Sequence, residues 1–247
     1  KKKASVVIVS KINKKNNIKS QIKVKDTLEF LTQCSTIYRK NINTKIIAIT
    51  GSCGKTTLKE LLGSSFKKLS KVSTSPKSYN NKYGVPLSLF NINEKDEYGI
   101  LEVGMDKKGE IDFLSKIIKP DVSVITNINY AHAKNFKNIK EIALAKSEII
   151  NNTKNNGFLI LNSDDNFFNL QKKIALKKNI NIISFGIKNK NSNIKLLNIQ
   201  KVRQKYKITI KINNLKSYFL ISNSFQNNIL NILATLAVMS IFIDILK

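Results

Sequence analysis

Short apolar runs alternate along the middle of the chain with longer segments whose apolar residues recur at helical spacing. Runs typical of buried strands lie at 45–50, 98–103, 121–126, 158–161 and 180–185. Segments with helical spacing lie at 56–69, 109–118 and 138–151. Strands that alternate with helices are typical of a parallel sheet covered on both faces. The pattern therefore predicts an α/β fold, with a mostly parallel sheet flanked by helices.

The two ends of the chain depart from this alternation. Residues 4–9 and 21–24 predict short strands, and Asp26 opens a helix that reaches about Arg39. Residues 205–212 and 217–221 alternate in polarity, which predicts an antiparallel hairpin at one edge of the sheet. Polar residues interrupt the apolar segment 229–246, so we interpret it as a buried helix rather than a membrane span. The polar joint at 41–44 is the expected domain boundary.

The formal net charge of +27 raises the question of a nucleic-acid or membrane partner. Only two of the 43 basic residues, Arg39 and Arg203, are arginines, whereas nucleic-acid readers depend on arginine and concentrate their charge. The lysines are scattered among many asparagines and isoleucines, which indicates compositional drift. We therefore expect no nucleic-acid partner and no membrane insertion. Cys34 and Cys53 lack metal or redox spacing, which favours a reducing compartment.

The strongest chemical signal is the segment 50–57, TGSCGKTT, between a predicted strand and a predicted helix. Glycines let a tight turn aim backbone N–H groups at phosphate oxygens, and the helix N-terminus adds a positive dipole. Lys55 adds a full charge, and the Thr56 hydroxyl can hold Mg²⁺. Ile49 stands where the longer motif has a glycine, so the match is to the shorter pattern G-x-x-G-K-T-T. The alternatives are a tight turn with a surface lysine and, for Cys53, a reactive thiol or a small spacer.

Three further side chains follow or face the strand ends, where open α/β sheets bind ligands. Glu102 ends the strand 98–103 and could bind Mg²⁺; the alternative is a charge that faces solvent. His132, the only histidine, follows the strand 121–126 and is either a ligand or a packed or solvated residue. Lys146 falls on the apolar face of the helix 138–151, where a lysine is costly unless it is paired or chemically changed. The alternative is that Lys146 extends from the edge of that face into water.

Five segments occur in the order expected of the Mur ligase family, which the chain resembles from about residue 4 to about residue 240. They are GSCGKTTLKE (51–60), YNNKYGVP (79–86), LEVG (101–104) with GEI (109–111), TNINYAH (126–132) and AKSEI (145–149). The resemblance implies that residues 1–43 are the tail of an N-terminal UDP-substrate-binding domain and that 44–247 form the central ATP-binding domain. It also implies that a C-terminal amine-binding domain is absent from this chain.

The resemblance assigns roles to individual residues. ATP would contact Gly51, Ser52, Cys53, Gly54, Lys55, Thr56, Thr57, Asn80, Asn81 and Asn231. Metal ligands would be Thr56, Glu102, His132 and Lys146, with Lys146 carbamylated, and the catalytic residues would be Lys55, Lys146 and His132. Two positions depart from the family pattern, since Asn227 stands where a histidine is usual and Ser147 where a glycine is usual.

Within the family, the segments 79–86 and 101–111 imply the step that adds D-alanyl-D-alanine to UDP-N-acetylmuramoyl-tripeptide in peptidoglycan precursor synthesis. The reaction would use ATP and Mg²⁺ and pass through an acyl phosphate. We expect a cytoplasmic, monomeric enzyme whose partners are the UDP-N-acetylmuramoyl-peptide and D-alanyl-D-alanine. The alternatives are another Mur ligase step, a folylpolyglutamate synthase-like ligase and, from a different class, a non-catalytic nucleotide-binding module.

Overall fold

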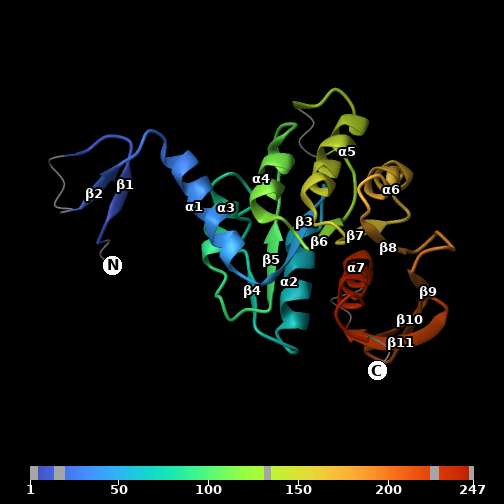
Figure 1. Cartoon of the computed structure of the whole chain (residues 1–247). Coiled ribbons are helices and arrows are strands. Elements are labelled where there is room, and N and C mark those ends of the chain that lie inside the picture. Colours follow the sequence, from blue (N-terminus) through green and yellow to red (C-terminus); the bar gives the residue numbers. More distant parts are fainter. Residues whose placement is uncertain (1–4, 14–19, 131–134, 223–227, 245–247) are drawn as a thin grey trace.

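The computed structural model describes residues 5–13, 20–130, 135–222 and 228–244. A nine-stranded sheet, in the order β11-β10-β9-β8-β7-β6-β3-β5-β4, forms the main body, and a two-stranded parallel sheet lies apart from it near the N-terminus (Figure 1). The small sheet consists of β1 (Val7–Val9) and β2 (Gln21–Lys23). The strands of the large sheet are β3 (Lys45–Thr50), β4 (Val72–Thr74), β5 (Tyr98–Glu102), β6 (Val122–Ile125), β7 (Phe158–Asn162), β8 (Asn181–Gly186), β9 (Ile194–Val202), β10 (Lys205–Ile212) and β11 (Leu215–Ser222).

The strand directions confirm the predicted fold. Strands β3 to β9 are joined by parallel pairs, whereas β9, β10 and β11 pair antiparallel. The hairpin β10–β11 therefore closes one edge of a mostly parallel sheet, as the alternating pattern predicts. Strand β3 lies between β5 and β6, so the loop that follows it opens at the centre of the parallel part of the sheet.

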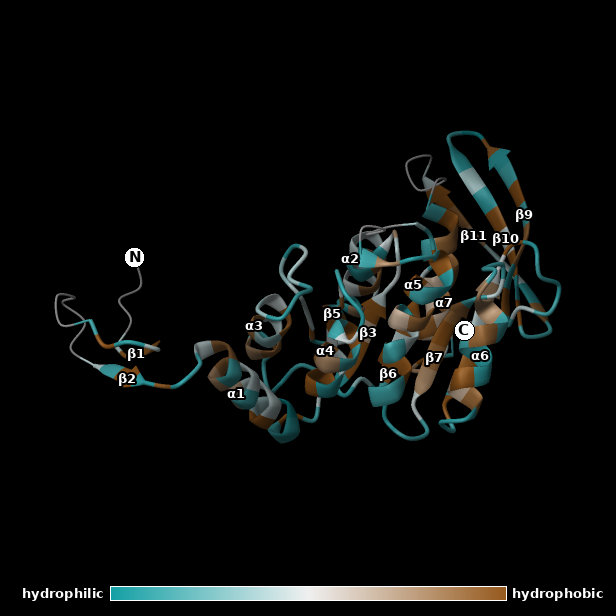
Figure 2. Ribbon diagram, turned by 90° about the horizontal axis from the view of Figure 1, so that it is seen from above, coloured by the Kyte–Doolittle hydropathy of each residue, from teal (hydrophilic) through white to brown (hydrophobic). Residues whose placement is uncertain are grey.

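Helices cover both faces of the large sheet. One apolar core contains residues of α3 (Gly84–Phe90), α4 (Glu110–Ile118), α5 (Ile139–Ser147) and α6 (Phe168–Leu176). The other contains residues of α2 (Lys55–Phe66) and α7 (Ile229–Met239). Side chains of β3 alternate between the two cores, with Ile46 and Ala48 in the first and Ile47 and Ile49 in the second. Figure 2 shows the resulting concentration of apolar residues in strands β3 and β7, between the helices.

Four elements and several helix ends differ from the pattern's predictions; α2, for example, ends at Phe66 and not at residue 69. The strands β4 and β9 and the helices α3 and α6 do not stand out in the apolar pattern, because they are short or only half-buried. The predicted helix 138–151 is shorter than expected. Helix α5 ends at Ser147, and the chain continues as a 3-10 helix over Glu148–Asn152. Because α7 is packed into the second core, the predicted buried helix near the C-terminus is confirmed, although it ends at Met239 and not near residue 246. Among the described residues, helices that could cross a membrane are absent.

Helix α1 (Thr27–Asn41) is attached to the central sheet by a buried arginine. Arg39 is 5% exposed, and its guanidinium donates hydrogen bonds to the carbonyl oxygens of Ile118, Lys119 and Ile42. The same guanidinium lies 3.2 Å from the carboxylate of Asp121. Although α1 precedes the joint at 41–44, it therefore lies against the sheet domain, on the side of α3 and α4 (Figure 1).

Candidate functional site

The loop between β3 and α2 takes a conformation that depends on glycine. Gly51 has φ 147° and Gly54 has φ 82°, in the region that L side chains rarely adopt. A Cβ atom on Gly51 would lie 1.9 Å from Thr126 Oγ1, so the turn leaves no room for a side chain. Gly54 is the N-cap of α2 and cannot cap it with a side chain. The first turn of α2, which includes Thr56 and Thr57, is therefore open to an anion.

The loop after β6 holds the phosphate loop in this shape. The Ser52 amide donates to the carbonyl of Asn127 at 3.0 Å, and the Cys53 amide donates to Asn127 Oδ1 at 3.0 Å. Thr126 Oγ1 donates to the carbonyl of Cys53 at 2.6 Å. The amides of Ser52 and Cys53 therefore have protein acceptors, which fix the shape of the loop. The cysteine side chain itself is exposed.

Two lysines converge on one carbonyl of this loop. Lys55 Nζ donates to the carbonyl of Gly51 at 2.8 Å, and Lys146 Nζ donates to the same oxygen at 3.1 Å. Lys146 is 1% exposed, so it does not extend into water. Burial and then the charge of Lys55 lower the pKa of Lys146 to about 7, against a smaller opposing effect of Cys53. Burial also lowers the pKa of Lys55, and Glu102 and then Cys53 oppose that shift.

Glu102 ends β5 on the strand next to β3 and is fully buried. The alternative that Glu102 is a charge that faces solvent is therefore wrong. Within the described residues, neither of its carboxylate oxygens accepts a hydrogen bond. Lys59 Nζ lies 3.1 Å from Oε1 and forms an ion pair by distance, without hydrogen-bond alignment. A buried carboxylate with open lone pairs is a good ligand for a cation.

The predicted asparagines lie at the same loop or at its rim. Asn231, in the first turn of α7, is adjacent to the phosphate loop, since a Cβ atom on Gly54 would lie 3.0 Å from its Oδ1. Asn80 is adjacent to Gly104, whose amide donates to the Asn80 carbonyl at 2.8 Å. Asn81 Oδ1 accepts hydrogen bonds from the amides of Tyr83 and Gly84 and so fixes the start of α3. His132 and Asn227 lie outside the described residues.

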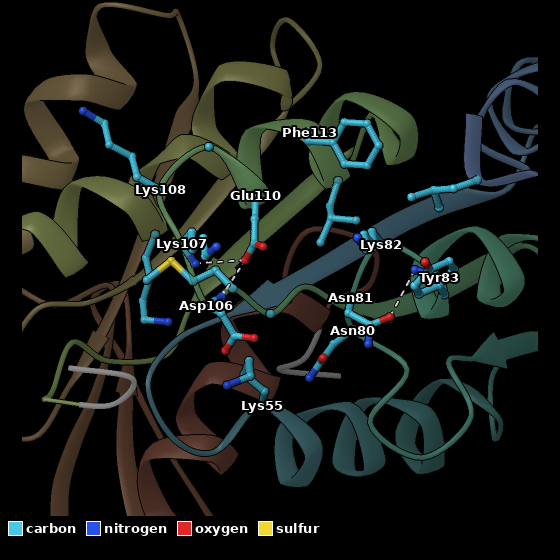
Figure 3. Close-up of a pocket in the computed structure, with 16 residues that line it drawn as sticks. Lys55, Asn80, Asn81, Lys82, Tyr83, Asp106, Lys107, Lys108, Glu110 and Phe113 are labelled. Carbon is cyan, nitrogen blue, oxygen red and sulfur yellow. Dashed lines mark hydrogen bonds between the residues drawn. The ribbon is translucent and has the colours of Figure 1, made fainter. Parts of the chain in front are cut away.

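A cleft of about 670 Å³ opens beside these residues. Figure 3 shows Lys55, Asn80 and Asp106 around the same space. Glu110 fixes one wall, because its carboxylate accepts hydrogen bonds from the amides of Asp106 and Lys107. The lining residues are Leu28, Lys55, Asn80, Asn81, Lys82, Tyr83, Gly104, Met105, Asp106, Lys107, Lys108, Gly109, Glu110, Phe113, Leu114 and Lys146.

Sequence reasoning missed several residues that shape the site. Asp165 accepts a hydrogen bond from the Ile128 amide at 2.7 Å and thereby anchors the loop that braces the phosphate loop. A signal for it is hard to find, since an aspartate in a polar loop after a strand is common. Lys59 had a signal, because it lies one turn after Lys55 and beside the apolar positions Leu58 and Leu62 of the same helix. Lys146 likewise falls on the apolar face of its helix.

A phosphate loop on a central strand, faced by a buried lysine and a buried carboxylate, defines the chain as a nucleotide-binding α/β protein. The family described as Mur ligase middle domain matches residues 49–239. Since this match covers most of the chain, the chain belongs to the Mur ligase family.

Relatives within the family agree with that assignment. The UDP-N-acetylmuramoyl-tripeptide–D-alanyl-D-alanine ligase of Buchnera aphidicola is 36% identical over 242 residues, which cover 98% of this chain and 52% of the relative. The ligase of the same name from Rickettsia prowazekii is 38% identical and covers 85% and 47% of the two chains. The chain therefore spans about half the length of the curated relatives that it matches.

Solved structures show the same likeness. MurF from Acinetobacter baumannii superposes with a TM-score of 0.86 at 28% identity, over 97% of this chain and 51% of that one. MurF ligase from Thermotoga maritima, solved in complex with ADP, superposes with a TM-score of 0.84 at 26% identity, over 98% and 56% of the two chains.

Proposed function

We propose that the chain forms the ATP-binding part of the ligase that adds D-alanyl-D-alanine to UDP-N-acetylmuramoyl-tripeptide. The observation that carries the proposal is the placement of Lys146. Its buried amine lies against the phosphate loop and also lines the cleft next to that loop. The relatives from Buchnera and Rickettsia bear the name of this ligase, and the Thermotoga structure holds ADP.

The proposed chemistry has two steps. A carboxylate oxygen of the tripeptide attacks the γ-phosphorus of ATP, the bond to the bridging oxygen breaks, and ADP leaves with that electron pair. The amine of D-alanyl-D-alanine then attacks the acyl carbon, phosphate departs, and the amine proton is released to solvent. Lys55 and the open first turn of α2 would stabilise the negative charge that spreads over the transferred phosphoryl group.

The residues of the site fit Mg²⁺, which would supply positive charge to the phosphate oxygens when bound. Glu102 offers buried oxygens that accept no hydrogen bond from the described residues, and Thr56 lies in the first turn of α2. Groups of three or more His, Cys, Asp or Glu side chains placed to hold a metal are absent from the described residues. A carboxylate such as that of Glu102 suits Mg²⁺, which binds through one or two carboxylates together with water and substrate phosphates. The resemblance adds His132 as a further ligand.

Lys146 would become a metal ligand by carbamylation. Its neutral amine would attack the carbon of CO₂, form an N–C bond and release a proton, which turns a cation into a carboxylate-like anion. Burial favours this change, because it lowers the pKa of Lys146 to about 7 and so populates the neutral amine near neutral pH. The product would place a negative charge beside Lys55, in place of a second positive one.

The finer assignments complete the proposal. The chain would combine the end of a UDP-substrate-binding domain, residues 1–43, with a central ATP-binding domain, residues 44–247. Asn80, Asn81 and Asn231 would lie beside the bound nucleotide, as their positions around the cleft and the phosphate loop suggest. We further propose that the protein works as a monomer in the cytoplasm.

The test is phosphate release from ATP by the full-length protein, with UDP-N-acetylmuramoyl-tripeptide and D-alanyl-D-alanine present. Release should require all three substrates and should yield the amide product by mass spectrometry. Release with glutamate and a folate, or with an earlier peptide precursor and its single amino acid, would assign a different ligase step. ATP binding without release under any of these conditions would indicate a non-catalytic nucleotide-binding module.

A further inference from the structure

Three lysines lie at the phosphate loop and at the neighbouring Glu102. Lys55 and Lys146 share the Gly51 carbonyl, and Lys59 pairs with Glu102. Two of the three ammonium groups are almost fully buried, since Lys59 is 4% exposed and Lys146 is 1% exposed. The proposed nucleotide, its metal ion and a carbamate account for Lys55 and Lys146. Lys59 has a different set of contacts and is not accounted for.

Lys59 contacts Glu102 away from the cleft. Neither Lys59 nor Glu102 lines the cleft, whereas Lys55, one turn earlier on α2, does. The Lys59 ammonium has two partners among the described residues, the carboxylate of Glu102 and the carbonyl oxygen of Lys77. A buried ammonium is costly unless both its charge and its donors are satisfied. The contacts therefore hold the Lys59 ammonium between Glu102 and the Lys77 carbonyl, away from the cleft.

The second contact links Glu102 to another wall of the site. Lys77 takes a left-handed backbone conformation, with φ 45°, at the start of the segment that leads to Asn80 and Asn81. Ser75, two residues before Lys77, also contacts Glu102, since the Glu102 amide donates to Ser75 Oγ at 3.3 Å. Helix α2, the end of β5 and the segment 75–81 thus meet at Lys59.

We propose that Lys59 is a positioning residue that holds Glu102 Oε1 from behind and leaves Oε2 directed to the metal that accompanies the nucleotide. The proposal rests on the proposed function, since it concerns the Mg²⁺ of a bound nucleotide. Partners behind a metal ligand orient it, and their loss commonly costs 10–100-fold in metal affinity. Lys59 would therefore set how much Mg²⁺ strengthens nucleotide binding, and would leave the direct contacts with phosphate to Lys55.

The experiment measures binding of a non-hydrolysable ATP analogue to the full-length protein by calorimetry, once with EDTA and once with Mg²⁺. Lys59→Met keeps the length of the side chain and removes its charge. We expect affinity in EDTA to stay within about 2-fold of the unaltered protein, and the gain from Mg²⁺ to fall by roughly 10-fold or more. Electron paramagnetic resonance of Mn²⁺ in the presence of the analogue should show the same loss. Lys67→Met, at the exposed end of α2, is the matched control and should change neither value.

Lys55→Met gives the pattern of a lysine that touches phosphate, with weaker binding in EDTA as well as in Mg²⁺. If Lys59→Met gives that pattern, or leaves the gain from Mg²⁺ intact, the positioning role is wrong. Absence of analogue binding by the unaltered protein, by contrast, would overturn the proposed function and this inference together.

A double variant covers the possibility that Lys59→Met leaves Glu102 buried without a partner and unfolds the chain. Lys59→Met with Glu102→Gln removes both charges and should fold, as thermal unfolding would show. Because Lys59 acts only through the carboxylate, the double variant should bind Mg²⁺ and analogue as Glu102→Gln alone does, within about 2-fold. A further loss of about 10-fold in the double variant would contradict the proposal.

Discussion

Lys146 Nζ donates a hydrogen bond of 3.1 Å to the carbonyl oxygen of Gly51, although the two residues are 95 positions apart in the chain. One belongs to helix α5 and the other to the turn that begins the phosphate loop. The contact places a buried amine against the phosphate loop, and Lys55 donates to the same carbonyl oxygen.

The first prediction concerns the chemical state of Lys146. Lys146→Glu should retain more ligase activity than Lys146→Ala, by about 10-fold, because a carboxylate partly replaces the carbamate's metal contact. Addition of bicarbonate should raise the activity of the unaltered protein prepared without CO₂ and should leave Lys146→Glu unchanged. The measurement is ATP-dependent phosphate release. If bicarbonate leaves activity unchanged and Lys146→Glu is no more active than Lys146→Ala, Lys146 is not carbamylated.

A second prediction follows from the pKa of the unmodified amine. The pKa of Lys146 falls from an ordinary value of 10.5 to about 7, so between these values the unfolded chain holds a proton that the folded chain lacks. The free energy of unfolding should therefore rise with pH above 7, by up to about 1.4 kcal/mol per pH unit from this residue. Below pH 7 the contribution is constant, because both states are protonated.

Urea unfolding in CO₂-free buffer from pH 7 to pH 9 measures this dependence, with Lys146→Met as the reference. The difference in unfolding free energy between the two proteins should change steadily over that range. A constant difference would show that Lys146 keeps an ordinary pKa in the folded protein.

The third prediction tests Lys55. Lys55→Ala should lower ATP turnover by about 100-fold or more, because the transferred phosphoryl group loses a half-buried positive charge. Lys68→Ala removes an exposed lysine just beyond the same helix and should leave turnover near its original value. Turnover by Lys55→Ala that stays near normal would exclude the proposed role of the phosphate loop.

The fourth prediction concerns the brace of the phosphate loop. Asp165 accepts hydrogen bonds from the amides of Ile128 and Phe167, so Asp165→Ala should lower the free energy of unfolding by about 1–3 kcal/mol. It should also weaken ADP binding, because the segment 127–129 holds the Ser52 and Cys53 amides. Asn166→Ala, at the exposed neighbouring position, is the control. Reduced stability with unchanged ADP affinity would show that the two loops are not coupled.

The apolar pattern predicted the central strands of the sheet well, because these strands are buried on both faces. Strand β3 is a continuous apolar run after Lys45, and such runs are visible without knowledge of their partners. The short helix α3 could not be predicted in the same way. Its start depends on Asn81 Oδ1, and its burial depends on packing beneath α1, which is distant in sequence.

The same distinction applies to the candidate site. The phosphate loop is local, so residues 51–57 could be recognised from their own order. Burial of Lys146 could be predicted from its helix face, but its contact with Gly51 could not, since it needs the order of strands in the sheet. Lys59 and Asp165 act through groups on other elements, and no spacing rule links them to those groups.

The phosphate loop follows β3, which lies between β5 and β6, so a nucleotide bound to the loop would stabilise the whole sheet. Residues 126–129 and Asp165 hold the loop in shape. A chain in which β3, β5 and β6 had separated would therefore have no complete site. Binding energy would then be added to global stability through mass action, as RT ln(1 + [L]/Kd). Nucleotide should therefore slow hydrogen exchange far from the loop, in β7 and α6, as well as in the residues that it touches.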